Sequence, residues 1–191
     1  MQRITGVVLA GGLGRRMGNL DKGLQPLDGR PLVALVLGRL APQVDEVLIS
    51  ANRNRDAYAA FGKRVIADRI EGYAGPLAGL HAGLAEASHG LVLSVPCDTP
   101  FIPMDLAPRL LAPLADEGID LAVAAAGGRT HYAICLARTR LLDGLANFLE
   151  SGGRKVAQWH ATLRVAEVGF DDQPGAFRNF NTSEDLHGDA R

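Results

Sequence analysis

The stretch that decides the fold runs from residue 6 to residue 22 and reads Gly6-Val-Val-Leu-Ala-Gly-Gly-Leu-Gly-Arg-Arg-Met-Gly18-Asn-Leu-Asp-Lys22. Its apolar beginning predicts a short buried strand over Ile4–Ala10. The chain then enters a loop with glycines at positions 11, 12, 14 and 18, where the backbone can approach a ligand with no Cβ in the way. Arg15, Arg16 and Lys22 add three cations, enough charge for more than one phosphate. The stretch therefore predicts a nucleoside triphosphate site.

Two better-known phosphate-binding motifs differ from this loop. A P-loop requires G-x-x-x-x-G-K-[ST], whereas Lys22 is followed by glycine and has no such spacing before it. A dinucleotide fingerprint requires G-x-G-x-x-G; Gly12 and Gly14 match, but Met17 occupies the third place and the next glycine comes one residue late. These mismatches argue against a Walker ATPase and a simple NAD enzyme. The remaining alternative is a glycine-rich turn whose arginines are only solvated.

Length and composition limit the class of protein. With 191 residues, 47% hydrophobic and 5% aromatic, the chain suits one domain over residues 1–191 with an aliphatic core. The net charge of −1 gives no overall field to recruit nucleic acid or an anionic membrane. No apolar run approaches the ~20 residues that cross a bilayer, and the N-terminus has no secretion signal. We therefore expect a cytoplasmic monomer without nucleic-acid or membrane partners, and Cys97 and Cys135 as free buried thiols.

Apolar runs alternate with amphipathic runs along the chain. The predicted strands are Ile4–Ala10, Glu46–Ala51, Arg64–Ala67, Gly90–Val95, Asp120–Ala125, His131–Leu136 and Leu163–Val168. The predicted helices are Pro31–Leu40, Asn54–Phe61, Pro76–Ala87, Asp105–Leu114, Leu141–Glu150, Arg154–His160 and a short last helix near Thr182 and Asp185. This alternation indicates an α/β fold with a doubly wound, mostly parallel sheet. Because Gly127-Gly128 predicts a turn into His131–Leu136, we expect one antiparallel edge strand.

A second group of chemistry-bearing residues follows the predicted strand Gly90–Val95. The segment reads Ser94-Val-Pro-Cys-Asp98-Thr-Pro100, so Asp98 stands just beyond the strand between two prolines that stiffen the backbone. In a doubly wound sheet this position faces the same crevice as the glycine loop. A carboxylate there can hold Mg²⁺ together with substrate phosphates. The alternative is an ordinary turn or helix-capping aspartate, but the neighbouring glycine loop favours the metal.

Polar residues follow two other predicted strands. Asn52 follows Glu46–Ala51 and Asp68 follows Arg64–Ala67, so both should lie at the same edge of the sheet as the glycine loop. Asp68 can accept hydrogen bonds from ribose hydroxyls or from the N–H groups of guanine. The alternative for each residue is an ordinary turn, although polar residues at successive strand ends favour a binding site.

Residues 75–79 read Gly-Pro-Leu-Ala-Gly and open a predicted helix. Gly75 and Gly79 allow a ligand to approach closely, and the positive N-terminus of the helix can bind a base edge or an anion. The alternative is a helix start with small residues that only improve packing.

The sequence contains no pattern for zinc or covalent catalysis. Its five histidines show neither H-x-x-x-H nor H-E-x-x-H spacing, and there is no G-x-S-x-G elbow. A phosphate oxygen acting as nucleophile is already ionised at pH 7 and requires no general base. Positioning and neutralisation of charge then carry most of the catalysis. The cations, the carboxylate and the glycine loop can supply both.

These motifs together resemble a known family over nearly the whole chain. Leu9-Ala-Gly-Gly12, Arg15-Arg-Met-Gly18 and Asp21-Lys-Gly23 are similar to the nucleotidyltransferase signature. The remaining motifs that carry the resemblance are Ala51-Asn-Arg53, Val65-Ile-Ala-Asp68, Gly75-Pro-Leu-Ala-Gly79, Pro96-Cys-Asp-Thr-Pro100 and Asn179-Phe-Asn-Thr182. The ordered set resembles the MobA family of molybdenum cofactor guanylyltransferases, and implies a Rossmann-like nucleotidyltransferase fold.

The resemblance also implies a reaction and its participants. GMP from Mg-GTP would be joined to the terminal phosphate of molybdenum-loaded molybdopterin, with release of pyrophosphate. The partners implied are GTP and molybdopterin, with Mg²⁺ as cofactor and chaperones or cofactor-insertion proteins of molybdoenzymes as candidate protein partners.

Site residues carry over only where the motifs match. The positions implied to bind the nucleotide or cofactor are Leu9, Ala10, Gly11, Gly12, Lys22, Asn52, Asp68, Gly75, Gly79 and Asp98. Asp98 is also the implied metal ligand, and the implied catalytic group is Arg15, Arg16, Lys22 and Asp98. Asn179 and Asn181 are implied to lie on the pterin or metal side.

Three other functions are also compatible with the sequence. Gly11-Gly12, instead of Ala-Ala-Gly, is closer to the guanylyl than to the cytidylyl branch of the family, but a cytidylyl enzyme shares the fold and the chemistry. A sugar-phosphate nucleotidyltransferase is the second rival. A non-catalytic nucleotide-binding or cofactor-carrier protein is the third, and it would have no need of Lys22 and Asp98 together.

Overall fold

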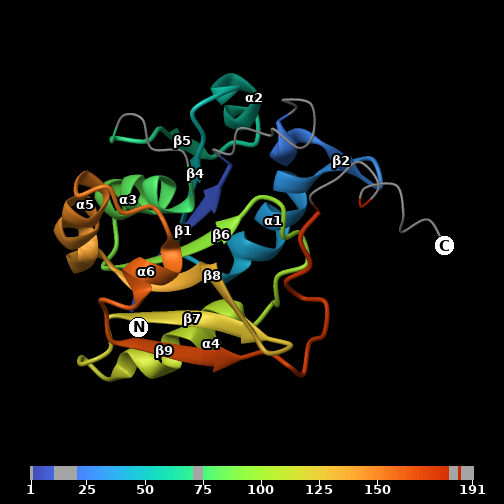
Figure 1. The fold of residues 1–191 in the computed structure, drawn as a ribbon. Helices are drawn as coiled ribbons and strands as arrows, with labels where there is room; N and C mark the ends of the chain where they lie inside the picture. Colours follow the sequence, from blue (N-terminus) through green and yellow to red (C-terminus); the bar gives the residue numbers. More distant parts are fainter. Residues whose placement is uncertain (1, 11–20, 71–74, 181–184, 186–191) are drawn as a thin grey trace.

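A seven-stranded sheet forms the centre of the protein in the computed structural model, which describes residues 2–10, 21–70, 75–180 and 185 (Figure 1). The strand order is β5-β4-β1-β6-β8-β7-β9. The strands are β1 (Ile4–Leu9), β4 (Glu46–Ser50), β5 (Arg64–Ile66), β6 (Leu91–Pro96), β7 (Leu121–Ala126), β8 (Arg129–Arg138) and β9 (Val165–Gly169). A small antiparallel ribbon of β2 (Pro26–Leu27) and β3 (Arg30–Pro31) lies outside this sheet.

Helices cover both faces of the sheet. The α-helices of the described residues are α1 (Leu32–Leu40), α2 (Arg55–Ala59), α3 (Pro76–Glu86), α4 (Leu106–Leu111), α5 (Leu142–Glu150) and α6 (Val156–His160). Short 3₁₀ turns are η2 (Lys22–Leu24), η3 (Ala41–Gln43), η4 (Ala112–Ala115) and η5 (Thr139–Leu141). Buried side chains of α1, α2 and α4 share one hydrophobic cluster, and those of α3, α5 and α6 share a second. The sheet is therefore doubly wound.

Alternation along the strands explains why two separate cores form. In β1, Val8 belongs to the cluster with α1, whereas its neighbour Val7 belongs to the cluster with α3. Both side chains are 0% exposed. Successive side chains of a strand point to opposite faces, so an apolar run such as Val7-Val8-Leu9 is what a strand covered on both faces requires.

The predicted elements are confirmed in order and type over the described residues. Each of the seven strands and six helices named from the sequence is present, with ends shifted by a few residues. The helix expected over Asp105–Leu114 begins one residue later and changes to the 3₁₀ turn η4 from Ala112. The last predicted helix lies outside the described residues except for Asp185. Cys97 and Cys135 are buried free thiols, as expected.

The position predicted for the antiparallel strand was wrong. β8 runs antiparallel, but it lies inside the sheet between β6 and β7, and the edge strands are β5 and β9. Gly127 and Gly128 have φ of 57° and 69°, which suits the tight turn that pairs β8 with β7. Residues 134–137 are buried. Ile134 and Leu136 belong to one core cluster, and Cys135 and Ala137 belong to the other. This continuous apolar run gives β8 two buried faces, and its ladders with both neighbours keep it inside the sheet.

No helix among the described residues has the length and apolar character to cross a bilayer.

Candidate functional site

The carboxyl ends of β5, β4, β1 and β6 form one continuous edge. Backbone hydrogen bonds extend the strand pairing past the strand ends: Ala51 N donates to Ile66 O at 2.9 Å, and Ala10 N to Ser50 O at 2.8 Å. Cys97 N donates to Leu9 O at 3.0 Å. These bonds hold the residues that follow the strands in register, so the loops after β5, β4 and β6 lie on the same side of the sheet.

Asn52 and Asp68 form a reciprocal pair at one end of this edge. The Asn52 amide Nδ2 donates to Asp68 Oδ2 at 2.8 Å, while the Asp68 backbone N donates to Asn52 Oδ1 at 2.9 Å. Burial raises the pKa of the Asp68 carboxyl, and the bond from Asn52 opposes that shift. The pair thus presents a fixed carboxylate, the acceptor that ribose hydroxyls or base N–H groups require.

Lys22 and Asp98 form an ion pair at the end of β6. Lys22 Nζ lies 2.8 Å from Asp98 Oδ2, and the side chains are 22% and 16% exposed. Lys22 stands on η2, which places it close to Asp98 although 76 residues separate the two in sequence. A cation and an anion held together at a sheet edge can bind a phosphate group and its counterion at the same time.

Asp98 fits a magnesium site that is completed by the substrate. Among the described residues there is no group of three or more His, Cys, Asp or Glu side chains that could hold a metal alone. Mg²⁺ in nucleotide sites is commonly bound by one or two carboxylates plus substrate phosphates and waters. Asp98 supplies one carboxylate of such a donor set, and substrate phosphates and waters would supply the other ligands.

The C-terminal segment reaches the same place from the other side. Phe180 N donates to the backbone carbonyl of Asp98 at 3.0 Å. The buried hydroxyl of Thr99 lies 3.0 Å from Asn179 Oδ1 and 3.3 Å from Asp98 Oδ1. Thr99 therefore links Asn179 to Asp98 of the ion pair.

The two glycines expected beside the ligand have different surroundings. Gly75 precedes α3 with a φ of +149°, a conformation that favours glycine. A Cβ on Gly79 would lie 2.9 Å from both Leu9 Cδ2 and Ser50 Oγ. Gly79 thus allows α3 to pack closely on β1 and β4, the packing alternative named above.

Five of the residues predicted to form the site lie outside the described residues: Gly11, Gly12, Arg15, Arg16 and Asn181. The structure brings Leu9 and Ala10 at the end of β1 to the same edge as Asn52, and Ala10 is buried.

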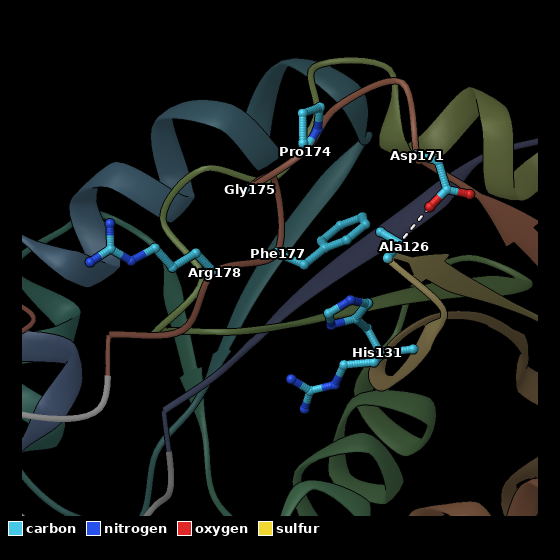
Figure 2. A pocket seen from close by; sticks show the side chains of 9 residues that line it. Ala126, His131, Asp171, Pro174, Gly175, Phe177 and Arg178 are labelled. Carbon is cyan, nitrogen blue, oxygen red and sulfur yellow. Dashed lines mark hydrogen bonds between the residues drawn. The ribbon is translucent and has the colours of Figure 1, made fainter.

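A pocket on the other half of the edge was not predicted from the sequence. Its volume is about 310 Å³, and it lies between the β7–β8 turn and residues 171–178 (Figure 2). The lining residues are Ala126, Gly127, Arg129, His131, Asp171, Pro174, Gly175, Phe177 and Arg178. They come from two segments far apart in the sequence, so no local motif marks the pocket.

Aromatic and cationic groups give this pocket its character. The His131 and Phe177 rings contact each other with centroids 4.7 Å apart, and Figure 2 shows both from the pocket side. Burial lowers the pKa of His131, with Arg129 adding to the effect, so neutral imidazole is favoured. Asp171 Oδ1 accepts a hydrogen bond from Gly127 N at 2.7 Å, which joins the two segments. The pocket can take a flat ring and, through its arginines Arg129 and Arg178, a nearby anion.

Comparison with known proteins identifies related chains. Residues 6–165 match the family model of the MobA-like NTP transferase domain. A protein of Shewanella putrefaciens named molybdenum cofactor guanylyltransferase is 45% identical over 182 residues, covering 95% of this chain and 93% of that protein. A protein of the same name from Cupriavidus metallidurans is 47% identical over 189 residues, covering 96% and 93% of the two chains.

A solved structure has the same fold. The crystal structure of molybdopterin-guanine dinucleotide biosynthesis protein A from Archaeoglobus fulgidus superimposes with a TM-score of 0.79, covering 96% of this chain and 95% of that one. The sequence identity is 24%, so this likeness concerns the fold. It agrees with the Rossmann-like nucleotidyltransferase architecture expected from the sequence.

Proposed function

Because the chain belongs to the MobA-like NTP transferase family, we propose that it joins GMP from Mg-GTP to the terminal phosphate of molybdenum-loaded molybdopterin. Relatives named molybdenum cofactor guanylyltransferase match it over almost their entire length. The structural observation that carries the proposal is the Lys22–Asp98 ion pair, because it places a cation and a carboxylate at the sheet edge.

The reaction needs positioning more than proton transfer. An oxygen of the acceptor phosphate forms a bond to the α-phosphorus of GTP, and the bond from that phosphorus to the α,β-bridging oxygen breaks. Pyrophosphate leaves with the electron pair of the broken bond. The attacking oxygen is already an anion at pH 7, so alignment and neutralisation of charge lower the barrier.

The described residues divide these tasks along the sheet edge. Asn52 and Asp68 hold the guanosine, and Gly75 opens the helix beside it. Lys22 neutralises the phosphates. Asp98 would hold Mg²⁺, which supplies further positive charge when bound.

The glycine loop and the C-terminal asparagines complete the site. In the proposal, Leu9, Ala10, Gly11 and Gly12 let the nucleotide approach the backbone, and Arg15 and Arg16 neutralise its phosphates. In the same proposal, Asn179 and Asn181 bind the acceptor. The pocket at His131 and Phe177 lies on the acceptor side, because Phe177 is two residues from Asn179.

The remaining expectations belong to the same proposal. The chain acts as one domain over residues 1–191, as a cytoplasmic monomer with no nucleic-acid or membrane partner. It delivers its product to molybdoenzymes through chaperones or cofactor-insertion proteins.

Titration calorimetry with GTP, CTP, ATP and UTP, each with and without Mg²⁺, tests the nucleotide. Selective binding of Mg-GTP is expected, followed by formation of the guanine dinucleotide and pyrophosphate when molybdenum-loaded molybdopterin is added. Preference for CTP would assign the cytidylyl reaction instead. Turnover with sugar phosphates would assign the sugar-phosphate class, and binding without turnover would leave a nucleotide-binding protein.

A further inference from the structure

Lys22 stands on an element too short to fix its side chain. η2 has three residues, and the backbone bonds at its ends are Leu24 N to Asp21 O at 3.2 Å and Gln25 N to Lys22 O at 3.1 Å. A single 3₁₀ turn has poor hydrogen-bond geometry. The position of the Lys22 ammonium group therefore depends on contacts between this turn and other parts of the protein.

The residue before Lys22 is bound to helix α2 by its carboxylate. The Tyr58 hydroxyl donates a short hydrogen bond to Asp21 Oδ1, and Asn54 Nδ2 donates to Asp21 Oδ2 at 2.9 Å. Both oxygens of Asp21 thus accept from α2 or its first flanking residue. Asn54 has a φ of 50°, a left-handed conformation that asparagine tolerates better than most residues.

Tyr58 is held rigidly as a donor. Its side chain is 0% exposed and belongs to the hydrophobic cluster of α1 and α4. Burial raises the pKa of the Tyr58 hydroxyl far above its ordinary value, and the charge of Asp21 adds to the effect. The phenol therefore stays protonated and can only donate to Asp21.

The residue after Lys22 is packed between Tyr58 and the end of β6. A Cβ on Gly23 would lie 2.5 Å from Tyr58 Oη and 3.3 Å from Cys97 Cβ and Sγ. Cys97 directly precedes Asp98, the ion-pair partner of Lys22. The neighbours of Lys22 on both sides are thus fixed by Tyr58, against the strand end that carries Asp98.

We propose that Tyr58 is a positioning residue: through Asp21 and Gly23 it holds the Lys22 ammonium group in the geometry that meets Asp98 and the phosphates. The proposal rests on the proposed function for its catalytic consequence. Its structural part, that the hydroxyl of Tyr58 sets the position of Lys22, can be tested without any substrate.

The kinetic test is Tyr58→Phe, which keeps the buried ring and removes the hydroxyl. The charge of Lys22 is used most strongly in the transition state, and displacement of a reacting group by about 1 Å can cost about 100-fold in rate. We expect kcat with Mg-GTP and molybdenum-loaded molybdopterin to fall by about 10-fold or more, while KM for GTP changes by less than about 3-fold.

The substrate-free test uses the lysines. The chain has three, Lys22, Lys63 and Lys155, so protein labelled with ¹³C at the lysine ε-carbon gives three signals. The signal that disappears in Lys22→Arg identifies Lys22. Tyr58→Phe is expected to move that signal toward the position of a free lysine and to leave the other two unchanged.

Two further variants separate positioning from stability. Leu110→Ala empties a fully buried position in the same hydrophobic cluster, so it should lower the melting temperature yet keep kcat and the Lys22 signal of the wild type. Gly23→Ala pushes the turn away from Tyr58 and should reproduce both effects of Tyr58→Phe.

The outcomes separate the two proposals. If Tyr58→Phe keeps kcat within about twofold, or if the Lys22 signal stays in place, Tyr58 does not position Lys22 for catalysis and the inference is overturned. A wild-type protein that makes no product from Mg-GTP and molybdenum-loaded molybdopterin would contradict the proposed function alone, because the lysine signals still report on the contact.

Discussion

The two halves of the sheet edge are built in different ways. On the half formed by β5, β4, β1 and β6, parallel strands end side by side, and the polar residues follow the strand ends within a few positions. On the half formed by β8, β7 and β9, a hairpin turn meets a segment from the end of the chain. The first half is thus specified locally, whereas the second exists only after distant segments have met. In the proposed function the first half binds GTP and the second binds the acceptor.

Substitution of Asp98, at the junction of the two halves, should cause the largest loss of turnover. Asp98→Ala removes the carboxylate that pairs with Lys22 and would hold the metal, so turnover should fall by about 1,000-fold, or about 4 kcal/mol of transition-state stabilisation. The free energy of unfolding should fall by no more than about 1 kcal/mol, because both side chains reach solvent. Pyrophosphate release and urea unfolding measure the two quantities.

Asp143→Ala is the matched control for this substitution. Asp143 is exposed in the first turn of α5, away from the sheet edge, and its loss should leave turnover unchanged. Retained turnover in Asp98→Ala would remove Asp98 from the catalytic group. A large loss of stability instead would show that Asp98 is mainly a structural residue.

If the two halves bind different substrates, a substitution in each half should weaken the binding of one substrate only. These effects should be smaller than that of Asp98→Ala. Asn52→Ala removes the amide that orients Asp68, so it should weaken Mg-GTP binding by about 30-fold and leave KM for the acceptor unchanged. His131→Ala removes a ring from the pocket, so it should raise KM for the acceptor by about 10-fold and leave GTP binding unchanged. Calorimetry measures the binding of Mg-GTP to each variant, and steady-state kinetics measure the KM of each variant for the acceptor. Equal effects of both variants on GTP binding would mean that the halves do not divide the substrates.

The same contrast explains what could be predicted from the sequence. Asn52, Asp68 and Asp98 were placed correctly at one edge because each follows a recognisable strand, and parallel strands bring their carboxyl ends together. The internal position of β8 was missed because a strand's partner across the sheet is not encoded in its own residues. The pocket at His131 was missed for the same reason, since its walls belong to segments about 40 residues apart.

The contact between Tyr58 and Asp21 also could not be predicted from the sequence. Tyr58 is one aromatic residue in a short amphipathic helix, and nothing in that pattern distinguishes a core ring from a ring whose hydroxyl holds a loop. Its hydrogen bond joins residues 37 positions apart. Patterns along the chain thus identified the residues expected to meet the substrate, but not the residue that holds one of them in place.

Packing beneath the first half can be tested through two helical glycines. Gly79→Ala inserts a methyl group against Leu9 and Ser50, and overpacking of this kind should cost about 2 kcal/mol of unfolding free energy. Gly144→Ala is the matched control in α5, where no atom lies within 4 Å of the new methyl group; it should gain about 0.5–1 kcal/mol from the better helix propensity of alanine. Urea unfolding of both variants measures the difference. A neutral Gly79→Ala would mean that α3 can move away from β1 and β4 at little cost.

Acid should destabilise the protein in part through His160 on α6, whose ring contacts Tyr132 on β8 in the second half. Its side chain is 4% exposed, neither ring nitrogen has a hydrogen-bond partner in the described part of the chain, and burial lowers the pKa to about 4. Because the unfolded chain takes up this proton near pH 6.5 and the folded chain only near pH 4, protonation favours unfolding as the pH falls through that window. Between pH 7.5 and 5.5 this residue should cost about 1.4 kcal/mol of stability. His160→Leu should remove that share of the pH dependence in urea unfolding, whereas the same slope in the variant would place the acid sensitivity elsewhere.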